Sequence, residues 1–258
     1  GSPLFVFSQR TLIQRYRELH DAFARRYPKV RIAWSYKTNY LGAVCNVLHQ
    51  EGSWAEVVSA FEYRKARSLG VPGSRIIFNG PWKPNDILEQ AIEEGATLHL
   101  DHFDELYAVE QIASRLNKEV PVGIRLNFDT GYTEAWSRFG FNIESGAAMD
   151  AVQRIGSSRW LKLTGLHSHI GTFVLDVRAY AAQARIMSSF MEAAERAVGC
   201  QIDYLDIGGG FASKNALQGL YLPPDQVVPS FEQYAEAITG ALMEATRERT
   251  AAGKPLPE

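Results

Sequence analysis

The stretch that organises this sequence is Leu205-Asp206-Ile207-Gly208-Gly209-Gly210-Phe211. Its apolar first half is typical of a strand, and that strand ends in three successive glycines. Glycines leave their backbone N–H groups accessible and clear side chains from the path of a ligand, so this corner suits an anion such as phosphate. A flexible turn after a strand explains the same residues equally well. The choice between a phosphate nest and a turn depends on the other motifs in the chain.

Length and composition fit one large globular domain. The chain has 258 residues, of which 46% are apolar and 22% charged, and α/β barrels commonly run to about 250 residues. The formal net charge of −2 creates no field that would attract nucleic acid or an anionic membrane. Small neutral or zwitterionic molecules, such as an amino acid, are the expected partners.

The cysteine content and the absence of long apolar runs predict a cytoplasmic protein. Only Cys45 and Cys200 occur, with none of the spacings of a disulfide framework or a structural zinc site. No stretch reads as a membrane span or a secretory leader. We therefore expect a protein of the reducing cytoplasm.

Strand-like and helix-like stretches alternate along the chain. Strands are predicted at 30–36, 55–59, 75–78, 97–100, 120–127, 161–169 and 204–207, and helices at 9–27, 41–51, 63–69, 85–94, 103–117, 145–155, 177–198 and 231–250. A further short strand is predicted at 4–7, followed by Ser8 as the N-cap of the first helix. Since parallel strands need crossover helices, this order indicates a parallel sheet.

The number of strands leaves two architectures open. Seven strands would suit an open doubly wound sheet, whereas a (β/α)8 TIM-type barrel needs eight. Polar residues and glycines of chemical interest, however, end nearly every strand, and functional residues spread over all strand ends are typical of a barrel rim. We therefore expect residues 1–258 to form a single α/β barrel domain that stops before its eighth strand.

Charged residues with few obvious partners lie at the ends of the first two strands. Lys37 ends the first strand, where apolar neighbours could desolvate it, lower its pKa and make it an imine-forming amine. An ordinary solvated lysine is the alternative. Glu56 lies inside an apolar strand and needs a cationic partner such as this lysine. Glu62 could serve the same purpose, or only stabilise the start of a helix.

Further charged and polar residues stand out along the later strands. Arg125 lies in a strongly β-like stretch, so it must bind a carboxylate or a cofactor, a structural salt bridge being the rival interpretation. Asp101 is expected to cap the helix that follows it. His167 and His169 share one face of a strand, which suggests zinc, but no third ligand with suitable spacing is evident. His169 could instead stack on a planar ring, with the hydroxyl of Thr172 near its edge, or both histidines could belong to the core.

Taken together, these motifs resemble the fold-type III pyridoxal-phosphate enzymes, specifically the diaminopimelate/ornithine/arginine decarboxylase family. The likeness extends from Pro3 to Phe211 at least. The motifs that carry it, in chain order, are Ser35-Tyr36-Lys37-Thr38-Asn39, the acidic stretch 56–62, the stretch 76–80 with Lys83, Arg138-Phe139-Gly140-Phe141, His167-Ser168-His169-Ile170-Gly171-Thr172 and the glycine stretch 205–211. Each motif alone is weak, but six in the right order on the right strand ends are specific.

The resemblance implies a barrel of the alanine racemase-like kind that binds pyridoxal 5′-phosphate. It implies that Lys37 joins the cofactor aldehyde and that His169 stacks on the pyridine ring. It further implies that Gly208, Gly209, Gly210 and Thr172 hold the phosphate or nearby oxygens, and that Glu56, Glu62 and Arg125 form a polar network around them. No metal is implied.

The chain departs from this family at its end. Family members continue into an eighth strand with a Glu-Pro-Gly-Arg motif and then into a C-terminal β domain, whereas this sequence stops at Pro257-Glu258, which could begin that motif. The function implied is decarboxylation of a basic or dibasic amino acid, in a homodimer when the protein is whole. A catalytically incomplete binding or regulatory homologue and an amino-acid racemase remain as alternatives. The loop 132–136 matches no family motif; it could shape the pocket, although a position at the surface is the expected one.

Overall fold

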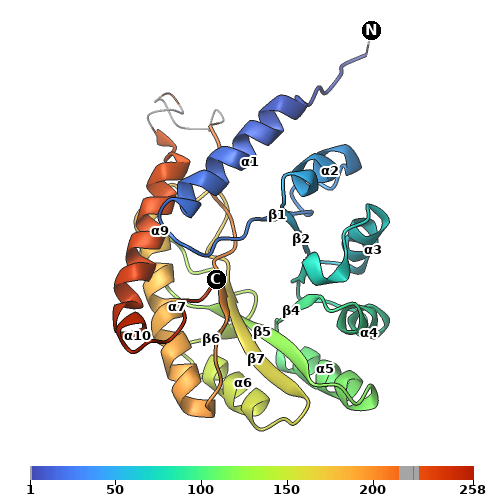
Figure 1. Cartoon of the computed structure of the whole chain (residues 1–258), viewed down its shortest axis with the longest axis vertical. Helices are drawn as coiled ribbons and strands as arrows, with labels where there is room; N and C mark the ends of the chain where they lie inside the picture. Colours follow the sequence, from blue (N-terminus) through green and yellow to red (C-terminus); the bar gives the residue numbers. More distant parts are fainter. Residues whose placement is uncertain (1, 215–222, 224–226) are drawn as a thin grey trace.

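A computed structural model describes residues 2–214, 223 and 227–258. Figure 1 shows a curved parallel sheet with helices around its outside. The elements, in chain order, are α1 (Gln9–Ala24), β1 (Ala33–Ser35), α2 (Gly42–Gln50), β2 (Trp54–Val57), α3 (Ala60–Ser68), a 3-10 turn (Gly73–Arg75), β3 (Ile76–Phe78), α4 (Asn85–Glu93), β4 (Thr97–Leu100), α5 (Phe103–Arg115), β5 (Val120–Asn127), β6 (Phe141–Asn142), α6 (Ala147–Gly156), β7 (Leu161–Ser168), α7 (Val177–Val198), β8 (Tyr204–Asp206), α9 (Phe231–Ala245) and α10 (Arg247–Ala251).

The predicted seven strands are confirmed, and all of them run parallel. Their order in the sheet is β1-β2-β3-β4-β5-β7-β8, and the short β6 pairs only with β5. Sequential order without a switch point is that of a barrel and not of an open doubly wound sheet. Since β1 and β8 are the outer strands of this order, a seam lies between them.

The last residues of the chain enter this seam next to β8. The N–H of Glu258 donates to Asp203 O, and its C=O accepts from Leu205 N–H, both at 2.8 Å. Glu258 thus bonds to the two residues that flank Tyr204, which is the hydrogen-bond pattern of a parallel strand pair. From the other side of the seam, Tyr27 donates to Pro257 O at 2.7 Å.

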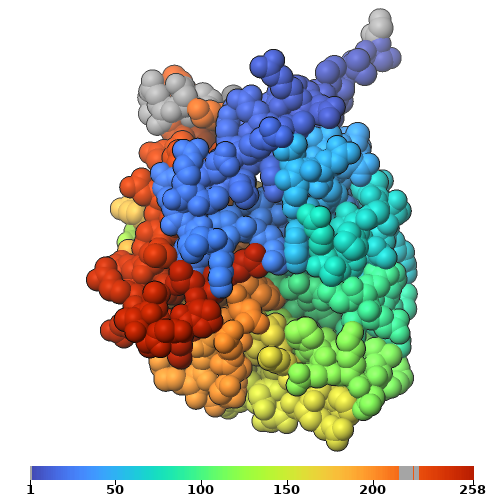
Figure 2. All heavy atoms as spheres, in the orientation of Figure 1, coloured from blue at the N-terminus to red at the C-terminus, as the bar shows by residue number. Residues whose placement is uncertain are grey.

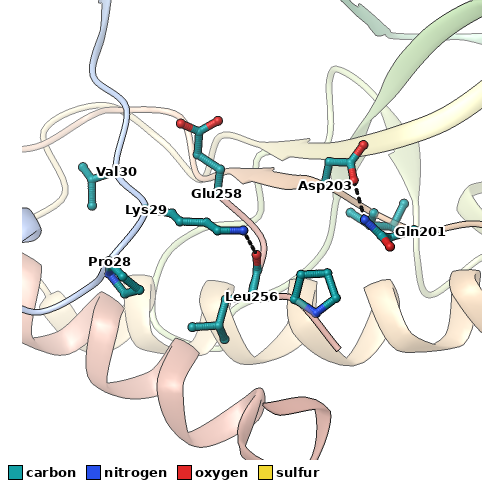
Figure 3. A pocket seen from close by; sticks show the side chains of 9 residues that line it. Pro28, Lys29, Val30, Gln201, Asp203, Leu256 and Glu258 are labelled. Carbon is teal, nitrogen blue, oxygen red and sulfur yellow. Dashed lines mark hydrogen bonds between the residues drawn. The ribbon is translucent and has the colours of Figure 1, made fainter. Parts of the chain in front are cut away.

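A cavity also lies at this seam, but at the opposite end of the barrel from the strand ends of chemical interest. It has a volume of about 490 Å³ and is bordered by 28–30, which precede β1, by 201–203, which precede β8, and by the C-terminal residues. Figure 3 shows Lys29 reaching across it to Leu256 O, at 2.9 Å. Since the cavity lies at the N-terminal ends of the strands, it is separate from the rim where barrels place their active sites.

Two predicted elements differ in the structure. Residues 4–7 form no strand; Leu4 is 83% and Phe5 92% exposed, and the segment extends away from the body ahead of α1 (Figures 1 and 2). An isolated apolar run has no neighbouring strand to pair with here, so its β-propensity is not satisfied. The predicted helix 231–250 is divided at Thr246 into α9 and α10. Ser8 does cap α1, as predicted.

No helix in the described ranges is long and apolar enough to cross a membrane.

Candidate active site

Lys37 lies in the turn that directly follows β1, on the rim formed by the C-terminal ends of the strands. Its side chain is exposed, so the desolvation expected for it is not present. The turn leaves the sheet before the amine could be enclosed by the apolar strand residues. Its positive charge nevertheless acts on two neighbours: it helps to lower the pKa of His169 and opposes the raised pKa of Glu62. Lys37 therefore lies close to both.

His169 follows β7 directly and presents a neutral ring at the same rim. Burial, reinforced by the charge of Lys37, lowers the pKa of His169 to about 4. The N–H of Gly171 donates to its Nδ1 at 3.3 Å, which leaves the single proton of the neutral ring on Nε2. A neutral aromatic ring in a fixed orientation is suited to stacking.

The glycine corner, Gly208–Gly210, follows β8 after Ile207. Its carbonyls face the body of the protein: Gly209 O accepts from the hydroxyl of Tyr180 and Gly210 O from Val174 N–H, both at 2.9 Å. Within the described part of the chain, the N–H groups of Gly209 and Gly210 have no acceptor. A Cβ added to Gly210, whose φ is +86°, would lie 2.0 Å from Gly171 O, whereas one added to Gly209 would meet nothing within 4 Å. Gly209 and Gly210 thus have satisfied carbonyls and free N–H donors, with open space in front of Gly209.

The glycine corner and His169 are adjacent. A Cβ added to Gly208 would lie 3.1 Å from Cδ2 of His169, and His169 in turn is near Lys37. An amine, a neutral ring and an anion nest, contributed by β1, β7 and β8, therefore meet at one end of the barrel. Two strands at opposite ends of the sequence are brought together here because the barrel curves back toward its start.

Two carboxylates accompany Lys37. Glu56 on β2 accepts hydrogen bonds from Ser35 Oγ and, at 3.1 Å, from Asn79 Nδ2. Glu62, in the first turn of α3, accepts from Val58 N–H at 2.7 Å, and burial raises its pKa. Glu62 thus occupies the helix start proposed as its alternative role and also lies in the field of Lys37.

Arg125 forms a buried ion pair, the structural role that rivalled cofactor binding. Its NH1 lies 3.6 Å from Asp101 Oδ1, and its guanidinium lies 4.8 Å from the centre of the Phe139 ring. Asp101 does not cap α5 as expected: the cap is His102, whose Nδ1 accepts from Glu105 N–H. Thr172 is exposed after β7, in the connection to α7.

The two histidines of the His-x-His motif have separate surroundings. His167 does not join His169 but stacks on His99, with ring centres 5.0 Å apart and planes 11° apart. With Asp206 these two rings form a cluster whose ligand atoms lie within 4.8 Å of one another, as in a metal site. The lone pairs of imidazoles lie in the ring planes, so two nearly parallel stacked rings do not aim at one ion. His99 and Asp206 were missed in the sequence because neither belongs to a recognisable ligand spacing.

The loop 132–136 is not merely surface. Trp136 approaches His169 with ring centres 6.3 Å apart, and both line a small pocket together with Asn127 and Ile170. The sequence contains no pattern that links a tryptophan in a loop to a histidine 33 positions later.

The family model described as pyridoxal-dependent decarboxylase, pyridoxal binding domain, matches residues 10–253. The chain belongs to this family. Its cofactor is pyridoxal phosphate, and the rim fits that molecule: the glycine corner offers free donors and open space for a phosphate, His169 a neutral ring, and Lys37 an accessible amine.

Several relatives of this pyridoxal-binding domain are diaminopimelate decarboxylases. That of Zymomonas mobilis is 30% identical over 246 residues, covering 92% of this chain and 57% of that protein. That of Methanocaldococcus jannaschii is 27% identical over 259 residues, covering 94% of this chain and 57% of that protein. A crystal structure of diaminopimelate decarboxylase from M. jannaschii matches with a TM-score of 0.87 and 25% identity, covering 100% of this chain and 59% of that one. The domain thus spans less than two thirds of the length of these relatives.

Proposed function

We propose that this domain is the cofactor-binding barrel of a decarboxylase that removes the α-carboxylate of a basic or dibasic amino acid. The observation that carries the proposal is the meeting of Lys37, His169 and the glycine corner at one rim. The diaminopimelate decarboxylases among its relatives support the substrate class. Residues 1–258 would then be the cofactor-binding barrel of such an enzyme, and they span 57% of the length of these two relatives.

Each residue at the rim has a role under this proposal. Bound pyridoxal phosphate supplies an aldehyde for an amine and a ring that accepts electrons from the breaking bond. Lys37 is the amine, and His169 packs against one face of the ring without adding charge. The free N–H groups of the glycine corner bind the phosphate, with the Thr172 hydroxyl close by.

The charged residues below the rim complete this assignment. Glu56 and Glu62 hold the lysine ammonium in place through their negative charges. Arg125, bound to Asp101, contributes positive charge to the same network. We assign it no direct contact with the cofactor.

A lysine substitution tests the cofactor site. Lys37→Arg keeps the charge but cannot join an aldehyde, so we expect the variant to lack the visible absorbance band, at roughly 420 nm, that pyridoxal phosphate gives when bound to a lysine. Lys162→Arg, at an exposed position of β7, is the matched control and should keep the band. An unchanged band in Lys37→Arg would remove Lys37 from this role.

Activity assays of the longer protein separate the remaining functions. Release of carbon dioxide from diaminopimelate, lysine, ornithine or arginine identifies a decarboxylase and its substrate. Interconversion of the two enantiomers without carbon dioxide would identify a racemase. A cofactor band with neither reaction would identify a binding or regulatory homologue.

We also propose a homodimer in the cytoplasm. Two exposed apolar residues follow neighbouring strands: Phe61, in the first turn of α3 after β2, is 58% exposed, and Trp82, in the connection after β3, is 74% exposed. Exposed apolar residues of this kind are typical of contact surfaces. Cys45 and Cys200 are both free thiols, in keeping with a reducing compartment. Size measurements on the longer protein, with and without Trp82→Glu, test the dimer.

A further inference from the structure

A chain of hydrogen bonds crosses the interior of the barrel beneath the rim. It runs from Tyr204 on β8 to His99 on β4, where the hydroxyl and Nε2 are 2.9 Å apart. It continues from His99 Nδ1 to Asn79 Oδ1 at 2.6 Å and from Asn79 Nδ2 to Glu56 Oε1 at 3.1 Å. His99 and Asn79 are buried, and Tyr204 and Glu56 are partly buried at the two ends.

The acceptor at one end, Glu56 Oε1, sets the direction of the protons in this chain. The Asn79 amide turns its NH2 group to Glu56, so its oxygen faces His99. His99 Nδ1 must then be the donor. Burial lowers the pKa of His99 to about 3, so its ring carries one proton, and its Nε2 accepts from the hydroxyl of Tyr204. All donors therefore point toward Glu56.

Two glycines make this crossing possible. A Cβ on Gly165 of β7 would lie 1.9 Å from Cζ of Tyr204, and a Cβ on Gly123 of β5 would lie 2.6 Å from both the Tyr204 hydroxyl and His99 Cδ2. Glycine inside a strand weakens the strand unless a close approach requires it. The strands between the two ends of the crossing thus lack side chains where the tyrosine passes.

We propose that Tyr204, His99 and Asn79 are positioning residues that hold the Glu56 carboxylate toward the rim, and so couple the strand of the glycine corner to the strand beside Lys37. Glu56 is near enough to the rim for its charge to act on both Arg125 and Glu62. The role of Glu56 at the cofactor site rests on the proposed function, whereas the directions of the protons do not depend on it.

The first test examines the protons in the chain without cofactor. Nitrogen-15 NMR of the histidine rings, with His99 assigned by its loss in His99→Gln, should show a neutral ring at pH 7 with its proton on Nδ1. Tyr204→Phe should leave that tautomer but shift the Nε2 signal toward that of an acceptor without a donor. A proton on Nε2, or a doubly protonated ring, would overturn the proposal.

The second test asks whether the chain matters for cofactor binding. Glutamine offers an NH2 donor group and a carbonyl acceptor, so His99→Gln should bind pyridoxal phosphate within about twofold of the unaltered protein. His99→Leu should bind roughly tenfold more weakly, because it leaves buried partners unsatisfied. Tyr204→Phe should weaken binding by several-fold. Tyr107→Phe, on the exposed side of α5, is the matched control.

The outcomes of the two tests are separable. Equal losses in His99→Gln and His99→Leu would show that the ring only fills space and would overturn the positioning role. If the unaltered chain bound no pyridoxal phosphate, the proposed function would fail, while the NMR result would still decide the direction of the protons.

Discussion

Burial of His169 should make the free energy of unfolding depend on pH in the acid range. Its pKa in the folded protein is about 4, against about 6.5 in an unfolded chain. Between these values the unfolded state binds the proton and the folded state does not, so stability falls as pH is lowered from about 6.5 to about 4. The contribution is on the order of 2–3 kcal/mol.

Urea unfolding at pH 7 and pH 4.5 measures this contribution. We expect His169→Gln to lose less stability between the two values than the unaltered chain does. His20→Gln is the control, because the His20 side chain is 41% exposed on α1. Equal acid losses in all three proteins would show that His169 titrates alike in the folded and unfolded states.

Lys83 illustrates a residue whose role is structural. Its amine, fully buried, donates to Glu105 Oε1 at 2.8 Å and to Gly80 O at 2.7 Å. Lys83→Met would leave the Glu105 carboxylate buried without its partner, at a cost of about 3–5 kcal/mol in the free energy of unfolding. Arg64→Met breaks the exposed pair with Asp86 and should cost less than about 1 kcal/mol. Comparable urea midpoints for the two variants would contradict this difference.

Local rules explain which residues the sequence identified and which it did not. Lys37, His169 and the glycines lie at strand ends, so their positions followed from the alternation of strands and helices. His99 and Tyr204 are 105 positions apart, and their contact depends on the curvature of the whole sheet. The sequence likewise could not tell that Asp101 binds Arg125 instead of capping a helix, since an adjacent histidine can cap as well.

At the scale of elements, we expect two adjacent glycines in the connection after β8 to have different roles. Gly210 is needed for folding, and Gly209 for binding of the phosphate. Gly210→Ala would place a Cβ against Gly171 O in a left-handed conformation, so we expect it to lower the free energy of unfolding by several kcal/mol, roughly. Gly209→Ala meets no atom and should fold normally, yet its methyl group would enter the space assigned to the phosphate.

Calorimetric titration with pyridoxal phosphate and urea unfolding together test this pair. Gly209→Ala should bind at least about tenfold more weakly while its urea midpoint stays close to that of the unaltered chain. Gly70→Ala is the control for Gly210→Ala: its φ is also positive, but no atom lies near the added Cβ, so it measures the conformational strain alone. Normal binding by Gly209→Ala would place the phosphate elsewhere.

Element boundaries were predictable where a local signal exists. Ser8 and the alternation of apolar residues placed α1 and the barrel strands. The strand expected at 4–7 did not form, because a strand needs a neighbour as well as a suitable sequence. The break between α9 and α10 at Thr246 has no proline or glycine to announce it.

At the scale of the whole molecule, the sheet is interrupted at one place only among the described strands, between β1 and β8. The residue groups assigned to the cofactor follow these same two strands: Lys37 comes after β1, and Gly208–Gly210 come after β8. A single small molecule bound to both would therefore connect the two margins of the seam.

Bound pyridoxal phosphate should then stabilise the contact between β1 and β8. A ligand that binds only the folded state raises the melting temperature by mass action. A ligand that also connects the two margins of the seam would in addition slow amide hydrogen exchange most at β1 and β8. The slowing would be least at β3 and β4, on the far side of the barrel. Uniform slowing of exchange would indicate general stabilisation only. Within residues 1–258, a barrel joined across its seam by the bound coenzyme would lose that connection whenever the coenzyme leaves, so loss of the cofactor and local opening at β1 and β8 would be one event.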